Sequence, residues 1–362
     1  MFIQKVKRAG ALALALCMAV LVLAACGGEG GSSSVPGSSS TPQSSSVQQE
    51  SSSLPDSSLP APEKQTVKLA GLKGPTTMGM VKLMEDAEQG LATHDYQVEM
   101  AGTADVIVPR LVSGELDAAA LPANLAATLY NSTEGKLRVV AINTLGVLYL
   151  VETDETIQSV EDLRGKTIYS TGKGTTPEFA LYYILRQNGL EPGVDVTVEF
   201  KAEATEIAAL LSEGADAIAV LPQPYVTAVQ LQNENVRVAL DLTAEWDKVG
   251  EGSALVTGVL VVREEFWAAA VESGLAADLL ADYQASIEWV NANTADAAAL
   301  VEKFGIVEKA AVAQKALPYC NIVYIDGDEM QARLEGYLQA LFDQNPEAVG
   351  GAMPAGDFYR KL

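Results

Sequence analysis

The chain contains an internal repeat whose two copies lie one hundred residues apart. The segment YQVEMAGTADVIVPRLVSGELDAAALP, residues 96–122, aligns with VTVEFKAEATEIAALLSEGADAIAVLP, residues 196–222, apart from a one-residue slip. Upstream, LKGPTTMGMVKL from Leu72 aligns with GKGTTPEFALYY from Gly172. Each copy therefore predicts a strand, a loop with Lys-Gly and two threonines, a helix, a strand, a helix, a strand and a Leu-Pro loop.

Strands that alternate with helices predict mostly parallel sheets flanked by helices, and two copies predict two α/β lobes. The apolar runs TLGVLYLVE from Thr144 and LVTGVLVVR from Leu255 bracket the second copy, which predicts a two-strand hinge. After Arg263, apolar residues recur at three- and four-residue spacing, which predicts helices that complete the first lobe. We therefore expect lobe 1 to contain residues 65–149 plus 256–362, and lobe 2 residues 150–255.

The amino-terminal region has the pattern of an export signal. Basic residues precede an apolar run from Ala11 to Leu23, which is short for a membrane-spanning helix of roughly 20 residues. The following LAAC resembles a bacterial lipobox, which implies a signal peptide at 1–25 and lipidation of Cys26; an uncleaved anchor or an ordinary signal peptide is the alternative. Residues 26–64 are rich in Ser, Gly and Pro, which predicts a flexible tether.

Charge and rare residues exclude several function classes. A net charge of −23 argues against nucleic acid or anionic lipid as a partner. Once Cys26 carries lipid, Cys320 is the one cysteine of the mature chain, and we expect a buried hydrophobic side chain rather than a disulfide. The single histidine, His94, is expected in a surface turn. Without a histidine and cysteine cluster or a Gly-x-Ser-x-Gly elbow, we expect no metal, no cofactor and no catalytic residue.

The loop STGKGTTPE, residues 170–178, raises the question of phosphate binding. The Walker pattern fails because Thr167 and Gly174 stand where it requires a glycine and a serine or threonine. The segment from Thr175 to Glu178 predicts either a capping box or a Thr-Pro helix start. Free backbone N–H groups there would favour an anionic or carbonyl-bearing ligand. Simple capping, with Lys173 in solvent, is the alternative.

Ligands of parallel α/β sheets bind at the carboxyl ends of the strands, so the two copies of this loop should face one another across a cleft. Lys73 and Lys173 could clamp a negative group, with two ordinary surface lysines as the alternative. Trp246 is expected to pack in a lobe, or else to cover the cleft. The candidate ligand-binding residues are Lys73, Thr76, Thr77, Asn124, Thr144, Lys173, Thr175, Thr176, Gln223 and Tyr225.

Three segments carry a family resemblance: EDLRGKTIYSTGKGTTPEFALYYILRQNGLEPGVDVTVEF from Glu161, LLSEGADAIAVLPQPYV from Leu210, and NANTADAAALVEKFGI from Asn291. In this order they resemble ABC-transporter substrate-binding proteins of the group that binds nitrate, sulfonates, taurine and pyrimidine precursors. The resemblance implies a two-lobed periplasmic-binding-protein fold of type II. It also implies delivery of a solute to a permease and its ATPase. With the lipobox, we expect a monomer that is anchored by lipid at the extracytoplasmic face.

The identity of the solute stays open. The loop GLKGPTTMG, residues 71–79, departs from the nitrate and sulfonate binders, and sulfonates, carboxylates and pyrimidine-like compounds suit the candidate residues equally. Two other functions are alternatives: a ligand-sensing receptor component without transport, and an exported enzyme. The fold also resembles a thiamine-pyrimidine synthase, but the histidine and cysteine-rich motif of that enzyme are absent.

Overall fold

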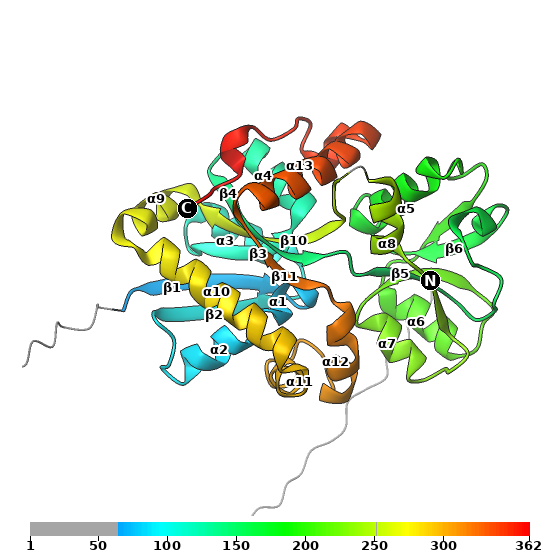
Figure 1. Ribbon diagram of the computed structural model, residues 1–362, viewed down its shortest axis with the longest axis horizontal. Helices are drawn as coiled ribbons and strands as arrows, with labels where there is room; N and C mark the ends of the chain where they lie inside the picture. The colour runs from blue at the N-terminus through cyan, green and yellow to red at the C-terminus, as the bar shows by residue number, and fades with distance from the viewer. Residues whose placement is uncertain (1–63, 251) are drawn as a thin grey trace, which may run out of the picture. The chain divides into compact units, whose positions relative to one another are not determined.

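The computed structural model describes residues 64–250 and 252–362, which fall within one compact unit of the chain (Figure 1). The predicted signal peptide, Cys26 and the tether up to residue 63 lie outside the described residues. None of the described helices is both long and apolar enough to cross a bilayer.

The first sheet has six strands in the order β11-β4-β10-β3-β1-β2. β1 pairs in parallel with β2 and β3, whereas β10 runs antiparallel between β3 and β4. The strands are β1 (Thr66–Leu72), β2 (Asp95–Ala101), β3 (Ala118–Pro122), β4 (Leu137–Leu145), β10 (Val256–Arg263) and β11 (Ile322–Ile325).

The second sheet has five strands in the order β7-β6-β8-β5-β9. β6 is parallel to β7 and β8, and β5 runs antiparallel between β8 and β9. This order matches β2-β1-β3-β10-β4 of the first sheet, so the strands of the two repeat copies, β1-β2-β3 and β6-β7-β8, occupy corresponding places. The strands are β5 (Leu148–Glu152), β6 (Thr167–Ser170), β7 (Thr197–Phe200), β8 (Ile218–Pro222) and β9 (Arg237–Asp241).

Helices cover both faces of each sheet, as Figure 1 shows. The predicted helical character after Arg263 is confirmed by five helices. The helices are α1 (Pro75–Met78), α2 (Val81–Glu88), α3 (Ala104–Ser113), α4 (Ala123–Ser132), α5 (Thr176–Gln187), α6 (Ala204–Ser212), α7 (Tyr225–Gln230), α8 (Leu242–Val249), α9 (Glu264–Ser273), α10 (Leu275–Ala292), α11 (Thr294–Lys303), α12 (Ala310–Ala316) and α13 (Gly327–Gln344).

Alternate strand residues pack into different apolar cores, because successive side chains of a strand point to opposite faces. In β10, Leu260 and Val262 pack with α2 and α10, whereas Val259 and Val261 pack with α4 and α13. The core on the α4 side is continuous with residues of the second sheet and of α5 and α8. The opposite face of the second sheet has a separate core with α6 and α7. The two sheets therefore share one apolar core on one side only.

Trp246 lies where this shared core joins the two sheets. Its ring centroid is 4.3 Å from that of Tyr183 in α5 and 5.6 Å from that of Tyr337 in α13. The side chain is fully buried, and Nε1 donates to Ser253 Oγ at 2.9 Å. The packing role expected for Trp246 is confirmed.

The last residues cross back over the first sheet. Asn131 Nδ2 in α4 donates to the carbonyls of Val349 and Ala352 at 2.8 and 2.7 Å. The amide of Arg360 donates to Val139 O in β4 at 2.8 Å. Arg138 is 7% exposed, and its guanidinium lies 2.9 Å from Asp357 and over the ring of Tyr130. The carboxyl-terminal segment is thus fastened to α4 and β4 along its length.

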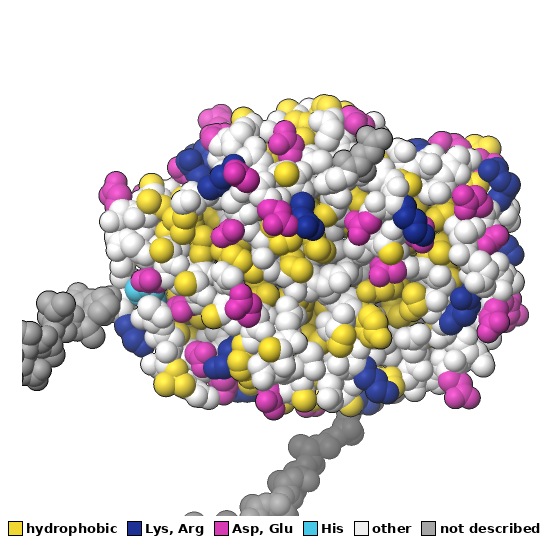
Figure 2. All heavy atoms as spheres, in the orientation of Figure 1, with side chains coloured by type: hydrophobic (Ala, Val, Ile, Leu, Met, Phe, Trp, Pro, Cys, Tyr) yellow, Lys and Arg dark blue, Asp and Glu magenta, His cyan; other side chains and the backbone are white. Residues whose placement is uncertain are grey.

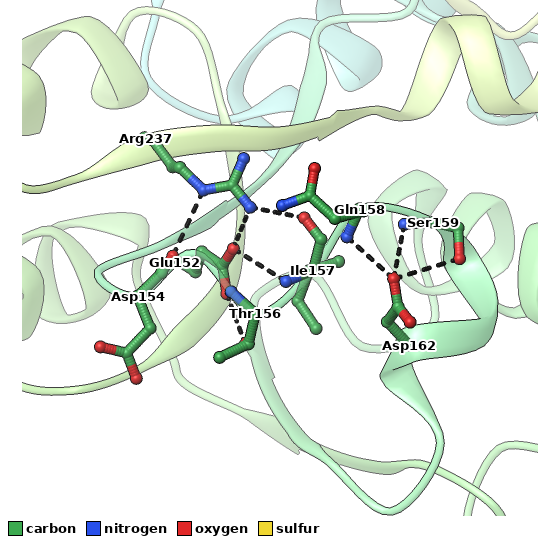
Figure 3. A network of polar contacts seen from close by, with 8 residues as sticks. All are labelled: Glu152, Asp154, Thr156, Ile157, Gln158, Ser159, Asp162 and Arg237. Carbon is green, nitrogen blue, oxygen red and sulfur yellow. Dashed lines mark hydrogen bonds and ion pairs between the residues drawn. The ribbon is translucent and has the colours of Figure 1, made fainter.

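A buried carboxylate fastens the far end of the second sheet (Figure 3). Glu152, 1% exposed at the end of β5, accepts hydrogen bonds from Ile157 N at 3.0 Å and from Thr156 Oγ1 at 2.8 Å. It also pairs with Arg237 of β9, whose Nε donates to Asp154 O at 3.3 Å. The turn after β5 is held to β9 by this carboxylate and by direct hydrogen bonds from Arg237 to Asp154 O and Ile157 O.

His94 and Cys320 are both buried. His94 is not a surface turn residue, because it is 6% exposed, accepts from Gln65 N and lies 3.1 Å from Asp278. Cys320 is buried as predicted, and burial raises the pKa of its thiol to about 12.

On the face drawn in Figure 2, acidic side chains are spread over most of the surface with basic ones between them.

Candidate functional site

The strand registers bring the carboxyl ends of the parallel strands of both sheets to the place where the chain passes between them. Pro122, at the end of β3, lies opposite Gly258 of β10, and Gly258 also pairs with Thr144 of β4. In the second sheet, Leu148 at the start of β5 lies opposite Pro222 at the end of β8. Only residues 146–147 separate β4 from β5, so the loops after β1, β3, β6 and β8 gather at this crossover.

The two crossover segments pack against each other. A Cβ atom on Gly146 would meet Thr243 Oγ1 and come within 2.8 Å of Leu255 Cδ2. Leu255 is fully buried and directly precedes β10. Asn321 holds the first crossover from outside, since its Nδ2 donates to Gly146 O and its carbonyl accepts from Leu145 N. Only glycine fits at position 146 without displacing one of these neighbours.

The loop after β1 presents one lysine and separates the roles of its two threonines. The Lys73 amide donates to Ala101 O at 3.0 Å, which ties the loop to the end of β2. The Lys73 side chain is exposed and has no ion-pair or hydrogen-bond partner within the described residues. Thr77 is fully buried and donates its hydroxyl to Leu72 O at 2.6 Å. Thr77 therefore shapes the loop from inside.

Thr76 and Thr144 come together around Gly258. A Cβ atom there would lie 2.5 Å from Thr76 Cγ2 and 3.3 Å from Thr144 Cβ, and would meet Asn143 Oδ1. Thr144 donates to Asn143 Oδ1 at 2.9 Å, and Asn143 Nδ2 donates to Tyr283 OH at 3.0 Å. The hydroxyl of Thr144 is thus engaged inside the first sheet.

Asn143 was not among the candidates from the sequence. It is 2% exposed and lies in β4, directly after the apolar residues 139–142. A buried amide must find hydrogen-bond partners, so a polar residue directly after this apolar run was the available signal. Asn143 links the end of β4 to α10.

The matching loop of the second sheet presents Lys173 and Thr175 to solvent. The Lys173 ammonium lies 6.0 Å from the centroid of the Phe200 ring. Thr175 donates its hydroxyl to Gly172 O at 2.6 Å, and Glu178 accepts from Gly174 N. Of the two helix starts left open by the sequence, the Thr-Pro start forms. The capping box does not, because neither side chain bonds within the Thr175–Glu178 pair.

Thr176 is 8% exposed and lies in the first turn of α5. Its Oγ1 is 3.4 Å from the hydroxyl of Tyr337, which donates to it from α13. Further along the same pair of helices, Gln344 Nε2 donates to Phe179 O at 3.3 Å. The helix that follows the Lys173 loop is therefore held by α13.

The three residues after β3 and β8 are placed differently from one another. Asn124 Nδ2 is turned toward Ala348 O at 3.4 Å. Gln223 is 3% exposed. Its backbone N–H donates to Val147 O at the crossover, and its side-chain Oε1 accepts from Thr227 Oγ1 at 2.8 Å. Tyr225 lines a pocket of about 500 Å³ with α6 and residues 306–312, and none of the other predicted site residues lines that pocket.

The described residues contain no group of three or more His, Cys, Asp or Glu side chains arranged to hold a metal ion. Of the predicted site residues, Lys73, Lys173 and Thr175 are exposed. Such a set can bind an oxygen-bearing anion by charge and by hydroxyl donors.

Two sheets of matching strand order, joined by two crossover segments with loops gathered between them, define a two-lobed periplasmic-binding-protein fold of type II. Solved structures of such proteins are similar to this chain over most of its length. An ABC transporter protein of Parabacteroides distasonis has a TM-score of 0.67 and 24% identity, and the match covers 82% of this chain and 99% of that chain. The predicted fold class is confirmed.

Two further structures share the fold. The periplasmic aliphatic sulphonate binding protein SsuA of Escherichia coli has a TM-score of 0.63 and 16% identity, over 79% of this chain and 94% of that one. The periplasmic nitrate-binding protein NrtA of Synechocystis PCC 6803 has a TM-score of 0.51 and 15% identity, over 79% and 83%. A search of curated proteins finds no match.

The family itself is shown by a family model, described as "ABC transporter, phosphonate, periplasmic substrate-binding protein", which matches residues 80–286. This range is more than half of the chain, so the chain belongs to this family of periplasmic substrate-binding proteins of ABC transporters. The resemblance found in the sequence is confirmed at this level. The family model describes substrate-binding proteins of ABC transporters.

Proposed function

We propose that the protein is the extracytoplasmic solute-binding lipoprotein of an ABC importer, and that it captures a small anionic organic solute at the crossover between its sheets. One observation carries the proposal: Lys73 and Lys173 follow corresponding strands of the two sheets, both are exposed, and neither has a carboxylate partner within the described residues. The chain has 47 acidic and 24 basic residues. In such a protein, two lysines kept free of carboxylates at matching positions favour an anionic ligand.

The names of the similar proteins point to the same chemistry. They are binders of phosphonates, sulphonates and nitrate, all of which are oxyanions. The fold likeness alone does not choose among these solutes. A multi-oxygen group on a small organic body suits two lysines together with the hydroxyl of Thr76, whereas the Thr175 hydroxyl already donates to Gly172 O.

Four of the remaining predicted residues have a shaping role in this proposal. Thr77, Thr144 and Gln223 hold the loops through internal hydrogen bonds, and Thr176 fixes the start of α5. The lobes are residues 65–149 plus 256–362 and residues 150–255. Closure of these lobes on the solute shifts an open–closed equilibrium by the difference in solute affinity of the two states.

Membrane attachment and delivery complete the proposal. Cleavage before Cys26 and its lipidation would anchor the protein at the outer face of the cell membrane, and residues 26–64 would tether it beside the permease and ATPase. Cys26→Ser should move the protein from the detergent phase to the aqueous phase in a partition assay. Equal partition of both forms would contradict the anchor.

Calorimetric titration with methylphosphonate, ethanesulfonate and nitrate tests the solute class, with dimethyl sulfone as a neutral control for ethanesulfonate. At least one anion should bind saturably, and dimethyl sulfone should not. The variant Lys73→Ala/Lys173→Ala should lose most of this affinity. The matched variant Lys82→Ala/Lys248→Ala removes the same charge from lysines that pair with Asp86 and Glu245, and it should bind as the parent does. Equal affinities of the two double variants would overturn the lysine clamp.

A further inference from the structure

Thr257 is the extra residue of a β-bulge beside the crossover. Val256 pairs with Leu145 and Gly258 with Thr144, so two successive residues of β4 face positions of β10 that are two residues apart. Thr257 is partly exposed, whereas Val256 before it and all residues from Gly258 to Val262 are buried. Bulges of this kind turn one side chain out of the ladder and are common next to functional sites.

The hydroxyl of Thr257 is buried and has no hydrogen-bond partner among the described residues. Buried hydroxyls in proteins nearly always have a partner, because an unpaired one loses its hydrogen bonds to water without replacement. Valine has the same shape and would avoid this cost. A hydrogen-bond partner from outside the chain would account for a threonine at this position.

A second unpaired hydroxyl lies close by. Thr76 is 8% exposed, and its side chain has no hydrogen-bond partner in the described part of the chain. Its Cγ2 lies 2.5 Å from the position of a Cβ atom on Gly258, the residue that follows Thr257. The same loop presents the unpaired ammonium of Lys73. Thr76 and Lys73 thus follow β1, and Thr257 directly precedes Gly258, which pairs with Pro122 at the end of β3.

We infer that Thr257 is a solute-binding residue, whose hydroxyl donates to one oxygen of the anionic group of the solute while Thr76 donates to another. This inference rests on the proposed function and deepens it. A phosphonate or sulfonate has several oxygens on one atom, and neighbouring hydroxyls can each take one. The bulge places Thr257 for this contact, and the bound solute supplies the missing partner of its hydroxyl.

Thr243 offers a matched control within the same protein. Its hydroxyl is also buried and unpaired within residues 64–250 and 252–362, but it packs against Gly146 beside Leu255, at the contact between the crossover segments. Replacement of either threonine by valine removes an unpaired hydroxyl without change of shape. Neither change should lower the melting temperature of the solute-free protein. Only the change at Thr257 should affect binding.

The experiment is calorimetric titration of methylphosphonate, ethanesulfonate and nitrate into the full folded chain and its variants. With the anion that the parent binds, Thr257→Val should weaken affinity at least about tenfold, the equivalent of one lost hydrogen bond to a charged group. Thr257→Ser retains the hydroxyl and should bind within about threefold of the parent, and Thr243→Val should bind as the parent does. If Thr257→Val fails to fold, Thr257→Ala carries the same expectation.

The outcomes separate the two proposals. If the parent binds an anion and Thr257→Val binds it equally well, the role of Thr257 is overturned while the proposed function stands. Equal weakening by Thr257→Ser and Thr257→Val would also overturn it, because the hydroxyl would then not be what matters. If the parent binds none of the three anions, the proposed solute class is overturned and the role of Thr257 with it.

Discussion

Arg237 and Glu152 face each other across the antiparallel pair of β9 and β5, and the Glu152 carboxylate also accepts from the backbone of the turn that follows β5. Burial raises the pKa of Glu152, but the hydrogen bonds from Ile157 N, Thr156 and Arg237 outweigh it and hold the pKa below its ordinary value of 4.5. The carboxylate form is therefore favoured by the folded state.

This relationship predicts a stability that depends on pH. Because the pKa of Glu152 is lower in the folded chain, its contribution is present above about pH 4.5 and is lost as the pH falls through the folded pKa. Glu152→Gln should lower the free energy of unfolding by about 2 kcal/mol at pH 7, and the difference should shrink at pH 3. Urea unfolding at both pH values measures this.

The control for this change is Glu191→Gln, which alters an exposed carboxylate paired with Arg186. Surface pairs contribute little, so its unfolding free energy should stay within about 0.5 kcal/mol of the parent. A constant difference between Glu152→Gln and the parent from pH 7 to pH 3 would contradict the role of the charge.

One substitution, tyrosine to phenylalanine, should have opposite effects at two buried positions. The hydroxyl of Tyr359 is buried without a partner among the described residues, so Tyr359→Phe should leave stability unchanged or raise it by about 0.5–1 kcal/mol. The hydroxyl of Tyr283 accepts from Asn143, so Tyr283→Phe should lower stability by about 1–2 kcal/mol. Denaturant midpoints of the two variants decide the matter, and a shared sign would refute the difference in pairing.

The carboxyl-terminal segment should stabilise the first sheet through Asp357. This carboxylate accepts from Tyr130 and pairs with the buried guanidinium of Arg138, and the same contacts lower its pKa. Asp357→Ala should lower the unfolding free energy by about 1–2 kcal/mol. Glu115→Ala, which removes an exposed partner of Arg110, should change it by less than about 0.5 kcal/mol. If Asp357→Ala and Glu115→Ala lower the free energy of unfolding equally in chemical denaturation, the pairing of Asp357 with the buried Arg138 does not stabilise the fold.

Gly146→Ala should strain the contact between the crossover segments. The added methyl group would meet Thr243 Oγ1 and Leu255 Cδ2, and such overpacking lowers stability by about 1–3 kcal/mol. Gly102→Ala provides the comparison, because nothing lies within 4 Å of its Cβ position. In thermal unfolding, the melting temperature of Gly102→Ala should equal or slightly exceed that of the parent, and that of Gly146→Ala should be well below it.

The repeat made the strand and helix order predictable, because period and turn residues are local properties of the chain. It even predicted the start of α6 one hundred residues after that of α3. The predicted place of the site, at the carboxyl ends of the strands, followed from the predicted parallel sheets. The solute-binding roles of Lys73, Thr175 and the other candidates stay predictions.

Other features depend on register and on partners distant in the chain. The bulge at Thr257 exists only relative to β4, and no pattern within β10 marks it. His94 is buried because Asp278, from a helix 184 residues further on, lies beside it. The engagement of Thr77 and Thr144 in internal hydrogen bonds likewise follows from the folded loops. Side-chain direction is thus what the sequence alone could not supply.

The apolar core that continues from the α4 side of the first sheet into α5 and α8 also bears on how the molecule unfolds. Separate cores would allow each half to melt at its own temperature. Here Trp246, Leu255 and Tyr337 lie in the one core that both halves share, so loss of packing in one half removes contacts from the other. Calorimetry should therefore record a single cooperative transition, and the slowest-exchanging amides of the two sheets should share one opening free energy.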